Sequence, residues 1–173
     1  MAGGKKTRFD LMEMMRKGEK VVYLTCYDYP TATLAEKAGV DMLLVGDSLG
    51  MCVYGYDGTL PVTMEQCIVH CDAVRRGAPN TFVVGDMPFM SYQESTSGAI
   101  HNAGRFHKEA AVDAIKLEGG QRVAAQIKGI ADSGMLVMGH VGLTPQSSGE
   151  LGGFKVQGRT AGAAQELLDD AAA

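Results

Sequence analysis

The chain contains 173 residues, with 16 Lys and Arg against 20 Asp and Glu and a formal net charge of −4. This mildly acidic balance excludes a broad basic surface for nucleic acid or for an anionic membrane. Hydrophobic residues make up 46% of the chain and charged residues 21%, a composition typical of a soluble globular protein and incompatible with disorder as the main state.

Short aliphatic runs alternate with helical patterns along the chain. An amphipathic pattern at 7–17 predicts a short first helix. Gly or polar residues bound the five runs of strand length, as is typical of buried parallel strands, at 21–25, 42–45, 81–84, 112–117 and 135–138. Further helical patterns occupy 31–38, 63–76, 94–109, 121–132 and 160–172.

This alternation predicts an α/β fold with a parallel sheet, either an open doubly wound sheet or a (β/α)8 barrel. The barrel is favoured because no GxGxxG follows the first strand, no GxxxxGK[ST] occurs, and polar motifs follow several successive strands. A barrel of this kind typically takes about 250 residues. With five strand runs and a last helical pattern that has no cap, we expect 1–173 to be one domain, the N-terminal part of a barrel with about its first five βα units.

Membrane spans and export signals are not predicted. The longest uncharged stretches, such as 133–149, are broken by Gly, Pro and polar residues, and the basic N-terminus lacks an apolar core. We therefore expect a cytoplasmic protein with four reduced thiols: Cys26, Cys52, Cys67 and Cys71.

Polar side chains follow the strand runs at a common point. Three runs end in Gly and a polar residue, which are Asp47, Asp86 and His140, and the run between the last two ends in Lys116 and Glu118. In a barrel these strand ends meet at one mouth, and Lys116 and Glu118 point to the same face because they are two residues apart. We therefore expect these five side chains at one site.

The carboxylates of Asp47, Asp86 and Glu118 would raise one another's pKa without a counter-ion. A hard divalent cation removes that conflict, and an all-oxygen ligand set suits Mg2+ better than Zn2+. The pattern therefore predicts a Mg2+ site, although each carboxylate alone could instead cap a helix. Asp28, after the first strand, could likewise line the mouth or cap the next helix.

Two loops, 46–63 and 139–159, are far longer than the ordinary βα connection of about 2–6 residues. We expect them to border the site, with flexible surface loops as the alternative. Cys67, His70 and Cys71 could suggest a metal site, but a helix with small buried side chains is favoured. His70, His101 and His107 lie in helical patterns and are expected to be at the surface or hydrogen-bonded.

Seven segments together resemble the ketopantoate hydroxymethyltransferase family. They are LTCYDYPTA (24–32), DMLLVGDSLGMCVYGYDGTLPVT (41–63), AVRRGAPN (73–80), VVGDMPFMSY (83–92), IKLEGG (115–120), GHVGLTPQ (139–146) and GGFKVQGR (152–159). The resemblance covers nearly the whole chain, from 20 to 168, and GDSLGM, TLPVT, GHVGLTPQ and GGFKVQGR in combination are highly specific.

The resemblance implies a (β/α)8 barrel of the phosphoenolpyruvate/pyruvate superfamily. It implies transfer of a hydroxymethyl group from 5,10-methylenetetrahydrofolate to 3-methyl-2-oxobutanoate through a Mg2+-stabilised enolate, giving 2-dehydropantoate for pantothenate and coenzyme A biosynthesis. It also implies a homo-oligomer of decamer type. Partners are therefore expected to be the two substrates and further copies of the chain, with no nucleic acid and no membrane.

Matched position by position, the resemblance assigns Asp47, Asp86 and Glu118 to Mg2+. It assigns the substrate to Asp47, Ser48, Asp86, Lys116 and His140. The family's general base is a glutamate after the next strand, and no position up to Ala173 matches it, so no catalytic residue is assigned. Two alternatives stay open, a related Mg2+-dependent 2-oxo acid lyase or mutase of the same superfamily and a non-catalytic truncated barrel.

Overall fold

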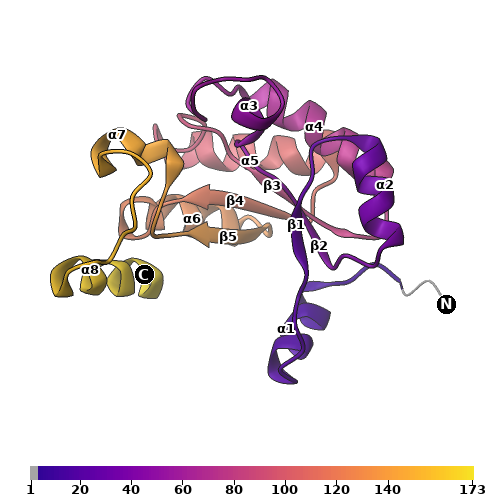
Figure 1. Ribbon diagram of the computed structural model, residues 1–173, viewed down its shortest axis with the longest axis horizontal. Coiled ribbons are helices and arrows are strands. Elements are labelled where there is room, and N and C mark those ends of the chain that lie inside the picture. Colours follow the sequence, from indigo (N-terminus) through magenta and orange to yellow (C-terminus); the bar gives the residue numbers. More distant parts are fainter. Residues whose placement is uncertain (1–3) are drawn as a thin grey trace.

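A five-stranded parallel sheet forms the centre of the computed structural model, which describes residues 4–173 (Figure 1). The strands are β1 (Tyr23–Thr25), β2 (Met42–Val45), β3 (Phe82–Asp86), β4 (Ala114–Glu118) and β5 (Leu136–His140). Their spatial order is β1-β2-β3-β4-β5, so each strand pairs in parallel with the one before it. The order never reverses, as it would at the switch point of an open doubly wound sheet, so the arrangement is that of a partial (β/α)8 barrel.

The helices follow the predicted alternation. They are α1 (Arg8–Arg16), α2 (Tyr29–Lys37), α3 (Leu49–Cys52), α4 (Met64–Gly77), α5 (Thr96–Ala110), α6 (Ala124–Asp132), α7 (Ser148–Leu151) and α8 (Ala161–Ala172). Side chains of Thr7, Asp28, Thr63, Ser95 and Thr160 cap five of these helices at their N-termini. Asp28 accepts a hydrogen bond from the Thr31 N–H, so this residue caps α2. The short helices α3 and α7 lie inside the two long loops, where the hydrophobic pattern predicted no helix.

Alternation along the strands divides the core into two faces. Leu43, Val83 and Ile115 belong to a larger cluster with residues of α2, α4, α5 and α6. The intervening residues, such as Met42, Val84 and Ala114, belong to a smaller cluster with Leu11 of α1. Asp86, Lys116, Glu118 and His140 continue this second, inner set, because side chains two residues apart share a face.

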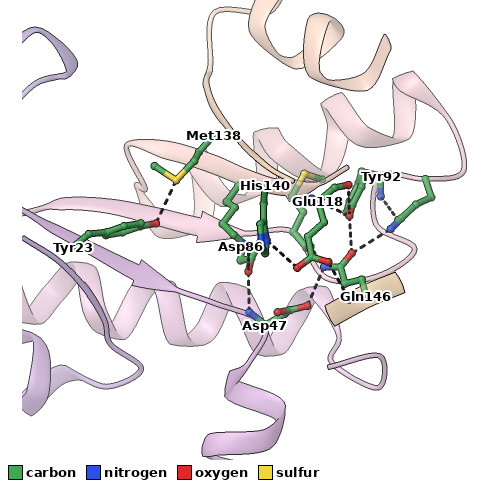
Figure 2. A network of polar contacts seen from close by, with 11 residues as sticks. Tyr23, Asp47, Asp86, Tyr92, Glu118, Met138, His140 and Gln146 are labelled. Atoms are coloured by element: carbon green, nitrogen blue, oxygen red, sulfur yellow. Dashed lines mark hydrogen bonds and ion pairs between the residues drawn. The ribbon is translucent and has the colours of Figure 1, made fainter. Parts of the chain in front are cut away.

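The sheet curves around its inner face. Tyr23 of β1 and Met138 of β5, at opposite edges of the sheet, approach within 3.5 Å through the Tyr23 hydroxyl and the Met138 sulfur (Figure 2). Such curvature is expected of strands that belong to a barrel. Polar side chains at the ends of the strands therefore lie on a concave surface.

Three strands end later than the aliphatic runs predict. The third was expected at 81–84 and ends at Asp86, the fourth was expected at 112–117 and ends at Glu118, and the fifth was expected at 135–138 and ends at His140. The additional residues pair in the ladder although they are polar or lack a side chain: Gly85, Asp86, Glu118, Gly139 and His140. Hydrophobicity marks the buried part of a strand, whereas backbone hydrogen bonds decide where the strand ends.

Burial and hydrogen bonding show where the cysteines and histidines singled out in the sequence lie. Cys67 and Cys71 are fully buried in the larger cluster. His70 donates through Nδ1 to the Tyr27 carbonyl at 2.5 Å, and Nε2 lies 3.0 Å from the Tyr54 hydroxyl. His101 is exposed, whereas His107 is half-buried and its Nε2 lacks a hydrogen-bond partner.

Within residues 4–173, no helix is long and apolar enough to cross a membrane.

Candidate active site

The register of the parallel sheet brings the predicted polar residues opposite one another. Asp86 pairs with Lys116 across β3 and β4, and Glu118 pairs with His140 across β4 and β5. The Lys116 ammonium donates to Asp86 Oδ2 at 2.7 Å. His140 Nδ1 lies 3.2 Å from Glu118 Oε1, at an orientation that makes no hydrogen bond.

Asp47 reaches the same cluster from the loop after β2. Its main-chain N–H donates to Asp86 Oδ2 at 3.2 Å, and its own Oδ2 accepts from Gln146 Nε2 at 2.9 Å. Asp47, Asp86 and Glu118 are only 2%, 1% and 5% exposed. Figure 2 shows the three carboxylates near one another at the ends of three neighbouring strands. The structure thus gathers the residues that the sequence singled out.

Among residues 4–173, Lys116 is the one lysine or arginine that pairs with these buried carboxylates. Burial raises the pKa of Asp86 to about 7, although Lys116 opposes this shift and Asp47 adds to it. Burial also raises the pKa of Asp47. The hydrogen bond from Gln146 lowers this pKa, and the negative charge of Glu118 raises it further. Negative charge is therefore under-compensated here, as the sequence analysis expected for a site that takes a cation.

Asp86 offers a specific acceptor to such a cation. Its Oδ1 is buried and has no hydrogen-bond partner, whereas most buried polar atoms in proteins have one. Together with the oxygens of Asp47 and Glu118, this atom makes an all-oxygen donor set that fits Mg2+.

The carboxylates are not arranged around a common point. Among residues 4–173, no group of three His, Cys, Asp or Glu side chains could hold a metal ion as it stands. Lys116 and Gln146 already donate to oxygens of Asp86 and Asp47. Oxygens of all three carboxylates can therefore meet at one cation only if at least one of the carboxylates rotates.

Ser48 lies at the start of the short helix α3. Its carbonyl accepts from the N–H groups of Met51 and Cys52, while its half-buried side chain makes no hydrogen bond to the helix. The residue follows Asp47 directly in the chain, so its backbone adjoins the cluster.

Gln146 and Tyr92 belong to the cluster, although neither was predicted as a site residue from the sequence. The Tyr92 hydroxyl lies 2.6 Å from Gln146 Oε1, and it accepts from the Glu118 N–H at 3.1 Å. Both residues end segments that carry the family resemblance, GHVGLTPQ and VVGDMPFMSY. The segments were therefore visible in the sequence, but nothing in them indicated which residue contacts the carboxylates.

A cavity of about 490 Å³ reaches the cluster from the side of Glu118 and Gln146. The loop 139–159 contributes Thr144 and Gly158 to its wall, and the loop 46–63 contributes Leu60. Both long loops therefore border the site, as expected. Tyr92 and Phe89 add an aromatic side to the same cavity.

Comparison with known proteins supports the resemblance. A model of the family described as ketopantoate hydroxymethyltransferase matches residues 5–173. The 3-methyl-2-oxobutanoate hydroxymethyltransferase of Alkaliphilus metalliredigens (strain QYMF) is 64% identical over 167 residues, which are 96% of this chain and 59% of that protein. The protein of the same name from Geobacillus kaustophilus (strain HTA426) is 55% identical over 166 residues, 96% of this chain and 60% of that protein. The chain thus spans about three fifths of the length of these relatives.

Solved structures share the fold at low sequence identity. A 2,3-dimethylmalate lyase, titled a member of the PEP mutase/isocitrate lyase superfamily, has a TM-score of 0.62 at 15% identity, covering 95% of this chain and 57% of its own. A phosphonopyruvate hydrolase, solved with oxalate and Mg++, has a TM-score of 0.61 at 12% identity, covering 75% of this chain and 50% of its own. They agree with the partial barrel seen here. On the family match and the identity to its relatives, the chain belongs to the ketopantoate hydroxymethyltransferase family.

Proposed function

We propose that the protein transfers a hydroxymethyl group from 5,10-methylenetetrahydrofolate to 3-methyl-2-oxobutanoate, giving 2-dehydropantoate for pantothenate biosynthesis. The observation that carries this proposal is the buried group of Asp47, Asp86 and Glu118 beside Lys116, at the strand ends of a chain in this family. Cytoplasmic location and assembly into a homo-oligomer belong to the proposal and rest on the resemblance.

The carboxylates of Asp47, Asp86 and Glu118 would hold Mg2+. When bound, the ion supplies Lewis-acid stabilisation of the negative charge that develops on the keto oxygen of the substrate. The unpartnered Oδ1 of Asp86 supports this assignment, because a buried acceptor without a protein donor leaves a position that a cation can occupy.

Three further side chains would orient the substrate. Lys116 and Ser48 would bind the carboxylate of the 2-oxo acid, which fixes the direction of the carbon that loses its proton. His140 would lie at the oxygen end of the substrate. Burial of Lys116, which is 9% exposed, strengthens its attraction for an anion by excluding water.

Removal of the substrate's proton is assigned to no residue of 1–173. General acid–base catalysis contributes about 10²–10⁴-fold to such reactions, so ligand binding by this chain can persist without turnover. A binding measurement therefore tests the proposed site more directly than an assay of turnover does.

The proposal is tested by calorimetric titration of the chain with 3-methyl-2-oxobutanoate, with and without Mg2+. We expect binding of the 2-oxo acid to depend on Mg2+. We also expect Asp86→Ala to weaken this binding at least about tenfold. Asp132→Ala, which removes a carboxylate of a surface ion pair on α6, is the control and should leave binding unchanged. Binding that is equal without Mg2+, or equal in Asp86→Ala, contradicts the proposal. Turnover with methylenetetrahydrofolate would show that a base lies within these residues.

A further inference from the structure

Gln146 contacts two of the three carboxylates at once. Its side-chain Nε2 donates to Asp47 Oδ2 at 2.9 Å, and its main-chain N–H donates to Glu118 Oε2 at 3.0 Å (Figure 2). The residue is only 5% exposed, so neither hydrogen bond is exchanged readily for water. One residue thereby holds one oxygen atom of Asp47 and one of Glu118.

The orientation of the Gln146 amide is determined by its neighbours. Nε2 lies 2.9 Å from both Asp47 Oδ2 and the Met87 carbonyl, which as a carboxylate and a carbonyl only accept. On the other side, Oε1 accepts from the Tyr92 hydroxyl at 2.6 Å and from Gln93 Nε2 at 3.2 Å. A flipped amide would place its oxygen against two acceptors, so only one orientation satisfies all four partners.

The Tyr92 hydroxyl strengthens this arrangement. It accepts from the Glu118 N–H at 3.1 Å, and two acceptors lie within reach of its single hydrogen, the Glu118 carbonyl at 3.1 Å and Gln146 Oε1 at 2.6 Å. The shorter distance favours donation to Gln146. A continuous path of donors therefore runs from the backbone of β4 through Tyr92 and Gln146 to Asp47. Such paths restrict each member more than isolated hydrogen bonds do.

The turn around Gln146 explains why its main-chain N–H is available. Pro145–Ser147 form a single 3-10 turn with Pro145 at its first position. The first N–H groups of a helical turn have no acceptor within the turn, so that of Gln146 is free to bond outside it. It meets Glu118, which attaches the loop 139–159 to the carboxylate cluster.

We propose that Gln146 is a positioning residue that holds one oxygen atom of Asp47 and one of Glu118, which leaves the other oxygen of each for a divalent cation once Asp86 rotates toward them. This inference rests on the proposed function, because the cation is part of it. Hydrogen-bond partners of metal-binding side chains typically change metal affinity by about 10–100-fold when they are removed. A Gln146 that only satisfied buried polar groups would affect the stability of the fold and leave the affinity for the cation unchanged.

The test measures Mg2+ affinity by calorimetry in the absence of substrate. Gln146→Met has a similar volume and no amide, and we expect its Kd for Mg2+ to rise about 10–100-fold. Gln66→Met is the matched control. Gln66 caps α4 by accepting from the Thr63 N–H, and it donates to the Tyr56 hydroxyl, so its loss affects stability without touching the carboxylates. Its Kd for Mg2+ should equal that of the unchanged chain.

A second variant separates the side chain from the main chain. Gln146→Asn keeps an amide and the main-chain N–H to Glu118, but it is one methylene too short to reach Asp47. We expect a rise in Kd similar to that of Gln146→Met. A folded variant of either kind with unchanged Kd overturns the role of Gln146, and so does the failure of both to fold, which would assign the residue to stability. Absence of Mg2+ binding by the unchanged chain instead overturns the proposed cation site.

Discussion

Lys116 and Asp86 form a buried ion pair at the ends of two neighbouring strands, with Nζ 2.7 Å from Oδ2 and side chains 11% and 2% exposed. The pair lies among the other carboxylates, so the positive charge of Lys116 offsets part of the electrostatic cost of burying them. A lysine on the inner face of a parallel strand is costly without such a partner, because an unpaired buried charge loses its hydration.

Removal of Lys116 should therefore destabilise the chain strongly. We expect Lys116→Met to lower the free energy of unfolding by about 3–5 kcal/mol, because it leaves Asp86 buried and unpaired. Lys128→Met, which breaks an exposed pair with Asp132 on α6, is the control and should cost less than about 0.5 kcal/mol. Urea unfolding of both variants near pH 8 checks this, and equal losses would show that the buried pair contributes little.

Protonation of Asp86 should make stability depend on pH. Its pKa is raised from 3.8 to about 7, chiefly by burial, so the folded chain holds this proton more tightly than the unfolded chain does. The stabilising contribution is therefore complete below about pH 4 and is lost as the pH rises to about 7. Asp86→Asn should lack this component.

The measurement compares the free energy of unfolding of the two chains across this range. We expect the difference between the unchanged chain and Asp86→Asn to fall steadily up to about pH 7 and to be constant above it. A difference that does not vary with pH would mean that Asp86 has an ordinary pKa in the folded state.

Gly85 allows close packing of α5 against β3. A Cβ atom there would lie 2.8 Å from Phe106 Cδ1 and 3.3 Å from Cys71 Sγ. We expect Gly85→Ala to lower the free energy of unfolding by about 1–3 kcal/mol through overpacking. Because Asp86 follows directly, substrate binding should weaken as well.

The matched control is Gly139→Ala, at the corresponding place in β5, where no atom lies within 4 Å of the added Cβ. Thermal unfolding should distinguish the two variants. Recovery of stability in Gly85→Ala combined with Phe106→Leu would identify the aromatic ring as the obstacle, whereas equal stability of the two single variants would contradict the packing argument.

The edge strand β1 should make the isolated chain self-associate. It pairs only with β2 among residues 4–173, and Val22, Tyr23 and Leu24 are 52%, 39% and 44% exposed. Exposed apolar edges are templates for pairing with another chain. We expect the 173-residue chain to form oligomers or aggregates, and Leu24→Lys to reduce them. Light scattering after size-exclusion chromatography measures this, and a monomer that melts cooperatively would contradict it.

The order of elements followed from local sequence, because hydrophobic runs and helical periodicity depend on near neighbours. The gathering of Asp47, Asp86, Lys116 and Glu118 also followed, since parallel strands place their C-terminal ends on one side. Asp28 was ambiguous because a carboxylate after a strand can cap a helix or line a site. In the structure its side chain accepts a hydrogen bond from the Thr31 N–H, so Asp28 caps α2.

The sequence by itself thus determined the fold class, the family and the set of charged residues at the strand ends. Only the tertiary structure decided how these residues contact one another. Gln146 meets Asp47 across 99 positions of the chain, and Tyr92 meets Gln146 across 54. Hydrogen bonds depend on distance and direction between groups, and no local pattern in the sequence records either when the partners are so far apart.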